Sequence, residues 1–245
     1  ALPILKKLIS LNAKIIVISN GLKNFFLSLG ATESSILVAP DAVNREEFNS
    51  PLSKEDARKK LGIDIDKKIV LYTGHLYSWK GAETLAQSAG MLPENTQVIF
   101  VGGTQKDVAD FKSHYHSEKI LFLGKKPHGE IPLYLRSADV LVIPNSAKED
   151  ISRLYTSPMK LFEYMASGVP IVSAELPSLR EIVNEEVVTF FAPDDAHSLA
   201  QSIRRVIEGG DESVRKAKRA FELVKSYSWM SRARAIRTFM SSSEV

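Results

Sequence analysis

Short uninterrupted apolar runs alternate along this chain with segments whose apolar residues follow helical spacing. Eight such runs predict strands, at residues 14–18, 36–38, 69–72, 97–101, 120–123, 140–143, 170–172 and 187–191. Most are continuous rather than alternating, which is typical of strands covered on both faces in a parallel sheet. The intervening segments predict helices at residues 55–61, 82–91, 106–116, 131–137 and 158–167. This alternation predicts an α/β fold with a doubly wound parallel sheet.

The pattern changes at both ends of the chain. From residue 196 to residue 240 it predicts nearly continuous helix, broken at Gly209-Gly210 and near residues 226–228. Near the start, a strand at 14–18 and a helix up to residue 29 precede a boundary at residues 40–44. We therefore expect extra C-terminal helices and an N-terminal segment separate from the main domain. The chain begins at Ala1 inside a helix-like stretch, so we also expect that an N-terminal portion is missing.

Composition narrows the classes of protein that remain. The 245 residues are 44% hydrophobic and 25% charged, which is ordinary for a soluble domain with a sizeable core. A net charge of +3 is too small to indicate a nucleic-acid partner. The absence of cysteine excludes disulfides, thiolate metal sites and cysteine catalysis, and it fits a reducing compartment. We expect a cytoplasmic protein.

Three loops follow predicted strands, where doubly wound sheets bind ligands. In the first, residues 72–81, Gly74 permits a tight turn and Lys80 stands where a helix begins, a position that suits a phosphate. It matches neither the Walker loop nor the dinucleotide fingerprint, and a solvated lysine is the competing interpretation. In the second, Gly102 permits close approach of a ligand or of another chain segment. The third, residues 124–130, either lines a flat ligand or simply connects two elements.

The stretch from residue 156 to 183 predicts a helix, a break, a buried strand and a second helix. Ser157 and Pro158 are predicted as N-cap and first helical residue, and Gly168 as the left-handed C-terminal position. The helix start near 157–159 is a candidate anion site. Glu163 is a charged residue inside an otherwise packed helix, which is costly unless it has a partner.

Other polar residues have ordinary interpretations. His114 and His116 do not share a helix face, so a metal site is disfavoured, and His128 and His197 are predicted as solvated. Trp79 is predicted to pack. The basic residues at 215–219, with Arg232 and Arg234, predict solvated helix faces, with a membrane-surface face as the alternative.

Five segments, in this order, resemble the C-terminal half of a GT-B glycosyltransferase of the retaining family-4, or group 1, type. They are residues 38–48, like PNGVD followed by F; Gly74 with Lys80-Gly81, like GRL…KG; residues 101–103, like VGxG; residues 122–144, like F.G…L..Y..ADV.V.PS; and residues 160–172 with Glu181, like LEAMAxGxPVV…E. The resemblance covers nearly the whole chain. It implies a Rossmann-like, donor-binding domain.

The resemblance also implies roles for individual residues. Lys80 matches a lysine that contacts the donor phosphates, and Glu163 matches the second glutamate of E-x7-E, which binds the ribose hydroxyls; these two are the catalytic candidates. Further binding candidates come from the amides near the helix start, the glycine loops and the base-contacting segment: Gly74, His75, Gly102, Lys126, Pro127, Ser157, Pro158, Met159 and Lys160. Lys160 would add a positive charge.

The implied partners are a UDP-, GDP- or ADP-sugar as donor and a saccharide or lipid-linked acceptor, with no metal or other cofactor required. The implied division is residues 1–43 as the end of an acceptor domain plus linker, 44–226 as the donor domain, and 227–245 as a C-terminal helix and tail. The fragment alone is expected to bind nucleotide but to transfer little or nothing. Peripheral membrane association is an open alternative.

Two positions depart from the family pattern. The first glutamate of E-x7-E is Tyr155, which bears on sugar recognition, and the arginine expected after Gly74 is His75, which bears on the phosphate clamp. These departures leave three alternatives open: a GT-B sugar-nucleotide epimerase, an inverting transferase, and a non-catalytic nucleotide-binding or interaction module.

Overall fold

A six-stranded parallel sheet forms the centre of the molecule. The computed structural model describes residues 2–242. The strands are β3 (Lys68–Thr73), β4 (Thr96–Val101), β5 (Ile120–Gly124), β6 (Val140–Ile143), β7 (Ile171–Ala174) and β8 (Thr189–Phe191), in the order β5-β4-β3-β6-β7-β8. The chain builds outward from β3 in one direction and then from β6 in the other. The switch point of the sheet therefore lies between β3 and β6.

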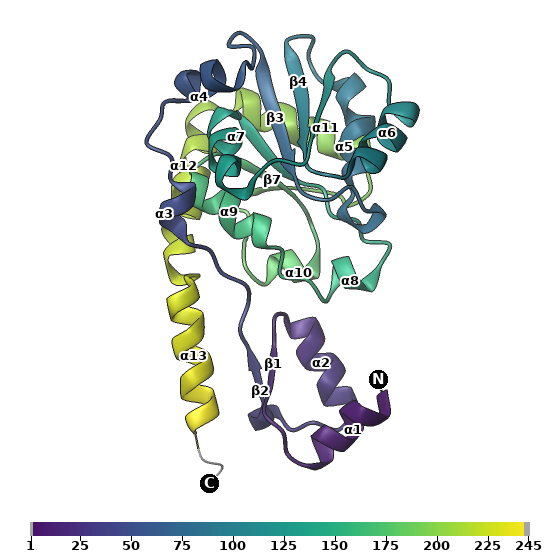
Figure 1. Cartoon of the computed structure of the whole chain (residues 1–245), viewed down its shortest axis with the longest axis vertical. Helices are drawn as coiled ribbons and strands as arrows, with labels where there is room; N and C mark the ends of the chain where they lie inside the picture. The colour runs from purple at the N-terminus through teal and green to yellow at the C-terminus, as the bar shows by residue number, and fades with distance from the viewer. Residues whose placement is uncertain (1, 243–245) are drawn as a thin grey trace.

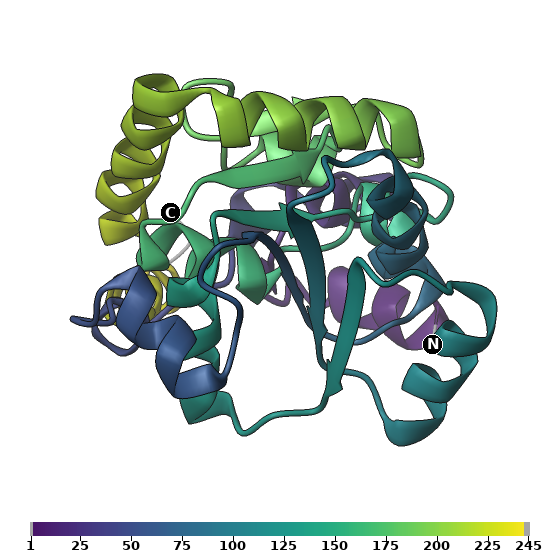
Figure 2. The same cartoon turned by 90° about the horizontal axis from the view of Figure 1, so that it is seen from above.

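Helices cover both faces of this sheet (Figures 1 and 2). On one face, α11 (Ala196–Glu208) contacts β6, β7, β8 and α5 (Ala82–Ser88), while α6 (Gln105–His114) packs on β5. On the other face, α7 (Ile131–Ser137) contacts β3 and α4 (Lys54–Leu61), and α9 (Met159–Ser167) contacts β6. Helix α12 (Gly210–Leu223) packs against α9. The central strands β3 and β6 are buried as a result, apart from Lys68 at the start of β3, which explains their uninterrupted apolar sequences.

The shorter elements connect these layers. They are α3 (Arg45–Phe48), α8 (Asp150–Arg153), α10 (Pro177–Arg180) and the 3-10 segments η1 (Glu33–Ser35), η2 (Ser78–Lys80), η3 (Ala89–Met91), η4 (His128–Glu130) and η5 (Val224–Ser226).

A smaller lobe lies beside the main sheet and below it in Figure 1. It contains α1 (Leu2–Ser10), α2 (Asn20–Ser28) and a two-stranded parallel sheet of β1 (Ile15–Val17) and β2 (Ile36–Val38). Helix α13 (Trp229–Ser241) runs down to this lobe. The Lys14 ammonium donates to the carbonyl of Phe239 at 2.6 Å, where the last carbonyls of α13 lack helical partners. The C-terminal helix is thus attached to the N-terminal lobe.

A buried ion pair lies at the amino-terminal end of the main sheet, where β3 and β6 begin. Arg58 on α4 donates to the carboxylate of Asp139 at 2.6 Å, and both side chains are less than a tenth exposed. The guanidinium also donates to the carbonyls of Ser137, Ile65 and Lys67. Asp139 further accepts from the Ile69 amide at 2.7 Å and from Lys54 at 2.6 Å. Every charged group here has partners, so the cluster fixes α4 against β3 and β6.

The predicted fold class and all eight predicted strands are confirmed. One detail of helix α9 was wrong. The helix begins at Met159 with Pro158 as its N-cap, and no side chain caps it. The Ser157 hydroxyl instead accepts a hydrogen bond from the Asp41 amide at 2.9 Å, which ties the linker to this loop. The end of α9 is as predicted, since Gly168 is left-handed with φ of 70°.

The sequence pattern did not predict two of the short helices. Helices α3 and α8 have four residues each, too few to show a helical period. No helix among residues 2–242 is long and apolar enough to cross a membrane.

Candidate functional site

A cavity of about 410 Å³ opens at the carboxyl ends of β3, β4 and β5, beside the switch point of the sheet. The loops after these three strands and the first turns of α9 line it. The lining residues are Thr73, Gly74, His75, Val101, Gly102, Gly103, Thr104, Lys125, Lys126, His128, Ile131, Lys160 and Glu163. Larger hollows lie at residues 43–46 with 224–230, at residues 168–170 with 214–222, and along α6, and they contain no buried charged side chain. The buried charges therefore single out this cavity.

Two glycines allow the loops to meet at the cavity floor. A Cβ on Gly102 would lie 2.0 Å from the Gly74 carbonyl oxygen, so no larger residue fits there. The Gly74 amide donates to Val101 at 2.9 Å, and the Gly102 amide donates to Gly124 at 2.8 Å. Gly102 therefore serves the close approach of another chain segment, the second of the two alternatives the sequence left open, while also lining the cavity.

Lys160 is the most unusual group in the cavity. Its side chain enters from α9 and is only 8% exposed. Among the described residues its Nζ has no hydrogen-bond partner, and it lies 3.9 Å from the centroid of the Tyr72 ring. Burial, reinforced by the nearby charge of Lys80, holds the pKa of Lys160 well below its usual range, although Glu163 opposes this. An unpaired buried amine of this kind is costly.

Glu163 lies one turn further along α9, is 9% exposed and lines the same cavity. Burial raises the pKa of its carboxyl group, while the charges of His128 and Lys160 act in the opposite direction. The sequence identified Glu163 as a carboxylate in need of a partner, and in the structure it faces a cavity instead of a complete set of protein partners.

Lys80 lies at the border of the cavity. It ends the short segment η2 and lies over the Trp79 ring at 3.8 Å, beside the cavity rather than among its lining residues. Burial lowers the pKa of Lys80 to about 8. Its charge acts on Lys160 and disfavours a proton on that amine.

The predicted helix-start residues do not line the cavity. Met159 is 46% exposed, and Ser157 is engaged with the Asp41 amide. Pro158 and Pro127 are also outside the lining, although Lys126 beside Pro127 belongs to it. The cavity thus gathers Gly74, His75, Gly102, Lys126, Lys160 and Glu163 from the predicted set.

The two departures from the family pattern have different surroundings. The Tyr155 ring packs edge-on against Phe25 of α2 at 6.3 Å. Next to it, the Ser19 hydroxyl donates to the Leu154 carbonyl at 2.9 Å, so position 155 joins the two lobes. His75 lines the cavity and stacks on Tyr77 at 4.9 Å.

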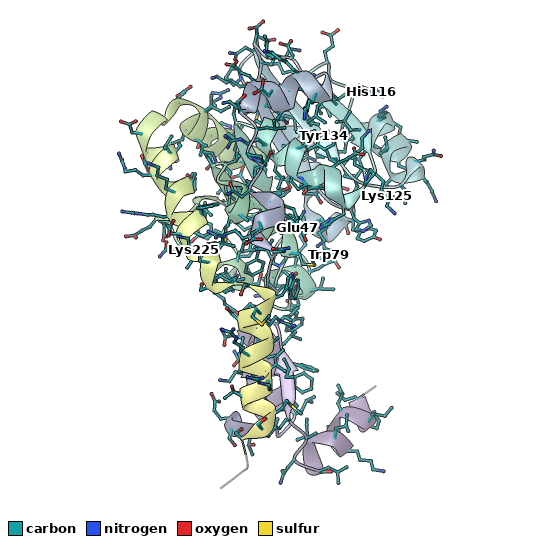
Figure 3. The ribbon with its side chains drawn as sticks, turned by 60° about the vertical axis from the view of Figure 1, so that its left-hand side comes forward. Glu47, Trp79, His116, Lys125, Tyr134 and Lys225 are labelled. Atoms are coloured by element: carbon teal, nitrogen blue, oxygen red, sulfur yellow. The ribbon has the colours of Figure 1, made fainter. Side chains whose placement is uncertain are left out.

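Sequence reasoning included Lys125 in the base-contacting segment, residues 125–127, but it did not single out several other residues at the cavity. His128 is exposed, as predicted, but it also lines the cavity and its ring lies 5.6 Å from that of Phe48. Lys125 belongs to the rim, and Figure 3 shows it with Trp79 on the side of the larger lobe away from Lys225. Tyr164 accepts from the Thr73 amide at 2.8 Å and so closes the end of β3. Position just after a strand end was the available signal for Thr73, Thr104 and Lys125.

This arrangement suits a ligand with anionic and hydroxyl groups. Lys80 and Lys160 supply two amines in a partly desolvated setting, where the attraction between a protonated amine and an anion is strong. A carboxylate accepts hydrogen bonds from a diol. Within residues 2–242 no group of three or more His, Asp or Glu side chains is placed to hold a metal ion.

Comparisons with known proteins identify the family of this chain. The family model of glycosyl transferases group 1 matches residues 53–223. A D-inositol 3-phosphate glycosyltransferase from Corynebacterium glutamicum is 26% identical over 192 residues, which cover 73% of this chain and 44% of that protein. The chain spans about half the length of the curated relatives it matches.

Solved structures show the same fold. The Anabaena protein HepE in complex with UDP superposes with a TM-score of 0.79 at 21% identity, over 92% of this chain and 63% of that one. Sucrose-phosphate synthase from Thermosynechococcus elongatus gives a TM-score of 0.80 at 24% identity, over 98% and 60% of the two chains. Taken with the family match over most of the sequence, these likenesses establish that the chain belongs to the glycosyl transferases group 1 family, with a GT-B type α/β fold.

Proposed function

We propose that this chain is the donor-binding part of a retaining glycosyltransferase that uses a nucleoside-diphosphate sugar. The observation that carries the proposal is the pair Lys160 and Glu163, two buried charged groups that face one cavity at the switch point of the sheet. The Anabaena protein HepE, which has the same fold, has been solved in complex with UDP and with UDP-glucose.

In this proposal, different parts of the site bind the diphosphate, the ribose and the base of the donor. The diphosphate lies near the Gly74–His75 loop, beside Lys160 and Lys80. The sugar end lies toward the helix start at 157–159, outside the residues that line the cavity. The Glu163 carboxylate accepts hydrogen bonds from the two ribose hydroxyls. The base lies toward Lys126 and Pro127.

The transfer step follows from where charge develops. The bond between the anomeric carbon and the diphosphate oxygen breaks, and its electron pair leaves with the nucleoside diphosphate. The ammonium groups of Lys80 and Lys160 stabilise this charge, which is electrostatic catalysis without a required metal. The acceptor hydroxyl bonds to the anomeric carbon from the same face and passes its proton to the leaving oxygen, which retains the configuration.

The proposal includes a division of the chain. Residues 44–226 bind the donor, residues 1–43 are the end of an acceptor domain with its linker, and residues 227–245 are a C-terminal helix and tail. The separate β1–β2 sheet and the attachment of α13 to it support this division. The acceptor would be a saccharide or a lipid-linked molecule, and the chain alone would transfer little or nothing.

Peripheral contact with a membrane is a further part of the proposal, supported by charge. Residues 2–38 and 224–242 contain one acidic residue, Glu33, but eight basic ones: Lys6, Lys7, Lys14, Lys23, Lys225, Arg232, Arg234 and Arg237. This lobe would be attracted to an anionic surface. Cosedimentation with vesicles of anionic phospholipid, but not with vesicles of phosphatidylcholine alone, is the expected result.

A non-catalytic nucleotide-binding module is the second candidate. It is favoured by Tyr155, which packs against Phe25 where the family pattern has a glutamate. Sugar release from a panel of donors, measured with a chain that includes the acceptor domain, separates the two. Release of free or transferred sugar supports the transferase, and binding without any release supports the module.

The direct test of the donor site is thermal unfolding with UDP, GDP and ADP. A ligand at a hundred times its dissociation constant should stabilise the chain by about 2.7 kcal/mol. The Glu163→Gln variant should lose affinity by about tenfold or more, because its uncharged amide is a weaker acceptor for the ribose hydroxyls. Glu118→Gln, on an exposed loop, is the matched control. If no nucleotide shifts the wild-type transition, the chain is not a donor domain.

A further inference from the structure

The cation that the family pattern places after Gly74 is absent, yet another cation reaches the same place from a different element. Position 75 is a histidine whose ring stacks on Tyr77. The Lys160 amine lies 3.1 Å from the point where a Cβ on Gly74 would stand. The amine therefore lies against the same turn that carries His75, although it comes from α9.

Gly74 is what allows this approach. Its φ of 136° lies in the left-handed region, and the absence of a side chain leaves room for the amine between the loop and the Tyr72 ring. The Tyr72 hydroxyl donates its hydrogen bond to the His75 carbonyl at 2.5 Å, and it is not hydrogen-bonded to the amine. The amine is thus held in place by contacts that leave its hydrogen-bonding capacity unused.

The groups that surround Lys160 come from several elements. Tyr72 belongs to β3, Lys80 to η2, and Glu163 to α9 itself. The cavity rim adds His75, Lys125 and Lys126 from the loops after β3 and β5, and His128 from η4. One carboxylate thus stands among several cations. A proton on Lys160 is disfavoured by burial and by Lys80, and Glu163 compensates only in part.

We infer that Lys160 is the second cation of the diphosphate site, supplied by α9 in place of the loop position held by His75, and that it takes up a proton when the diphosphate binds. This rests on the proposed donor function. The step is an acid–base one: the neutral amine accepts a proton from solvent and becomes an ammonium ion, whose charge the diphosphate then pairs. Unlike a fixed arginine, this cation is fully charged only when its anion is present.

The inference predicts proton uptake that calorimetry can count. UDP, GDP and ADP are titrated in turn into the 245-residue chain at about pH 7.5 in two buffers of different ionisation enthalpy, and the difference in binding heat gives the protons exchanged. For each nucleotide that binds, the wild type should take up about one proton more than the Lys160→Arg variant, because arginine is charged before binding. Uptake by Glu163 or Lys80 would persist in that variant and cancels in the difference.

Two further variants keep the test independent of how arginine fits. Lys160→Met should weaken binding by about tenfold or more, because it removes a charge-assisted contact. The double variant Lys160→Met with His75→Arg should regain most of that affinity without regaining proton uptake. Lys60→Met, on the exposed side of α4, should match the wild type in affinity and proton uptake.

The outcomes separate this inference from the function on which it rests. Nucleotide binding with equal proton uptake in the wild type and Lys160→Arg overturns the inference and leaves donor binding intact. Full affinity in Lys160→Met also overturns it. Absence of binding by all three nucleotides overturns both.

Discussion

Two buried clusters of ionisable side chains lie at opposite ends of the strands of the same sheet, here called the amino edge and the carboxyl edge. They differ in how many of their hydrogen-bonding groups have partners. At the amino edge, Arg58 and Asp139 bind each other and four backbone groups between them. At the carboxyl edge, the Lys160 amine has no hydrogen-bond partner among the described residues. The first cluster is completed by the protein, whereas the second is completed only by something that enters the cavity. Burial alone therefore does not mark a functional charge; an unused bonding capacity does.

The largest effect should come from breaking the paired cluster. Arg58→Met leaves Asp139 with a reduced set of partners and frees three carbonyls, so the free energy of unfolding should fall by about 3–5 kcal/mol. Urea denaturation measures this. Arg153→Met removes a half-exposed pair with Asp150 and serves as the control, with an expected change below about 0.5 kcal/mol. A loss from Arg58→Met as small as that of the control would show that the amino-edge cluster does not hold the fold.

Replacing the buried basic residue of the unpaired cluster by methionine should change the free energy of unfolding in the opposite direction. Lys160→Met replaces a buried amine that lacks partners with an apolar chain of similar length. The free energy of unfolding should therefore rise by about 1–2 kcal/mol. A substantial loss of stability in urea would mean that the amine has a structural partner, and the comparison between the edges would fail.

The pH dependence of stability should also differ between the clusters. Asp139 is surrounded by donors and cations that outweigh its burial, so its pKa is lowered; the stability it contributes is complete above its usual value of about 3.9 and is lost as the pH falls through the folded value. Burial lowers the pKa of Lys80 to about 8, so its penalty is greatest below that pH. That penalty shrinks as the pH rises from about 8 toward about 10, because the unfolded chain still holds its proton.

Midpoints of urea denaturation, measured from acid pH to about pH 10, test both the loss of stability at acid pH and the gain above about pH 8. Asp139→Asn should flatten the acid limb, and Lys80→Met should flatten the rise above about pH 8. A wild-type midpoint that falls steadily from about pH 8 to 10 would contradict the assignment of Lys80 as a destabilising, partly buried cation.

The smallest effect should come from the exposed cations at the cavity rim. Lys125→Met removes a solvated charge, so nucleotide affinity should fall by about two- to threefold, and the loss should shrink at high salt. Titrations at low and high ionic strength measure this. A loss as large as that from Lys160→Met would place the ligand's charge at the rim instead of on the cavity floor.

The sequence predicted the architecture well because the buried strands are marked by continuous apolar runs. It also identified Glu163, since a carboxylate in an apolar helix is visible without coordinates. It did not predict the Arg58–Asp139 pair, whose members are 81 positions apart and meet only after α4 packs against the sheet. Nor did it place Lys160 over Tyr72, because that contact depends on the turn at Gly74.

The helix start at residue 157 shows a different limit. Serine followed by proline is a common opening for a helix, so the local pattern predicted a capped end. The Ser157 hydroxyl is instead used by the Asp41 amide, more than a hundred residues away. Similarly, Tyr155 could be recognised as a departure from the family pattern, but its packing on Phe25 could not be read from its neighbours in sequence.

The most direct test of the account compares the stabilisation that one nucleotide gives to three chains: wild type, Arg58→Met and Lys160→Met. With UDP, GDP or ADP at about a hundred times the wild-type dissociation constant, the wild type and Arg58→Met should both gain about 2.7 kcal/mol in the free energy of unfolding. At the same ligand concentration, Lys160→Met should gain about 1.4 kcal/mol or less, because its affinity is at least about tenfold lower. An equal gain in Lys160→Met and the wild type would contradict the claim that the unpaired cluster is completed by the ligand.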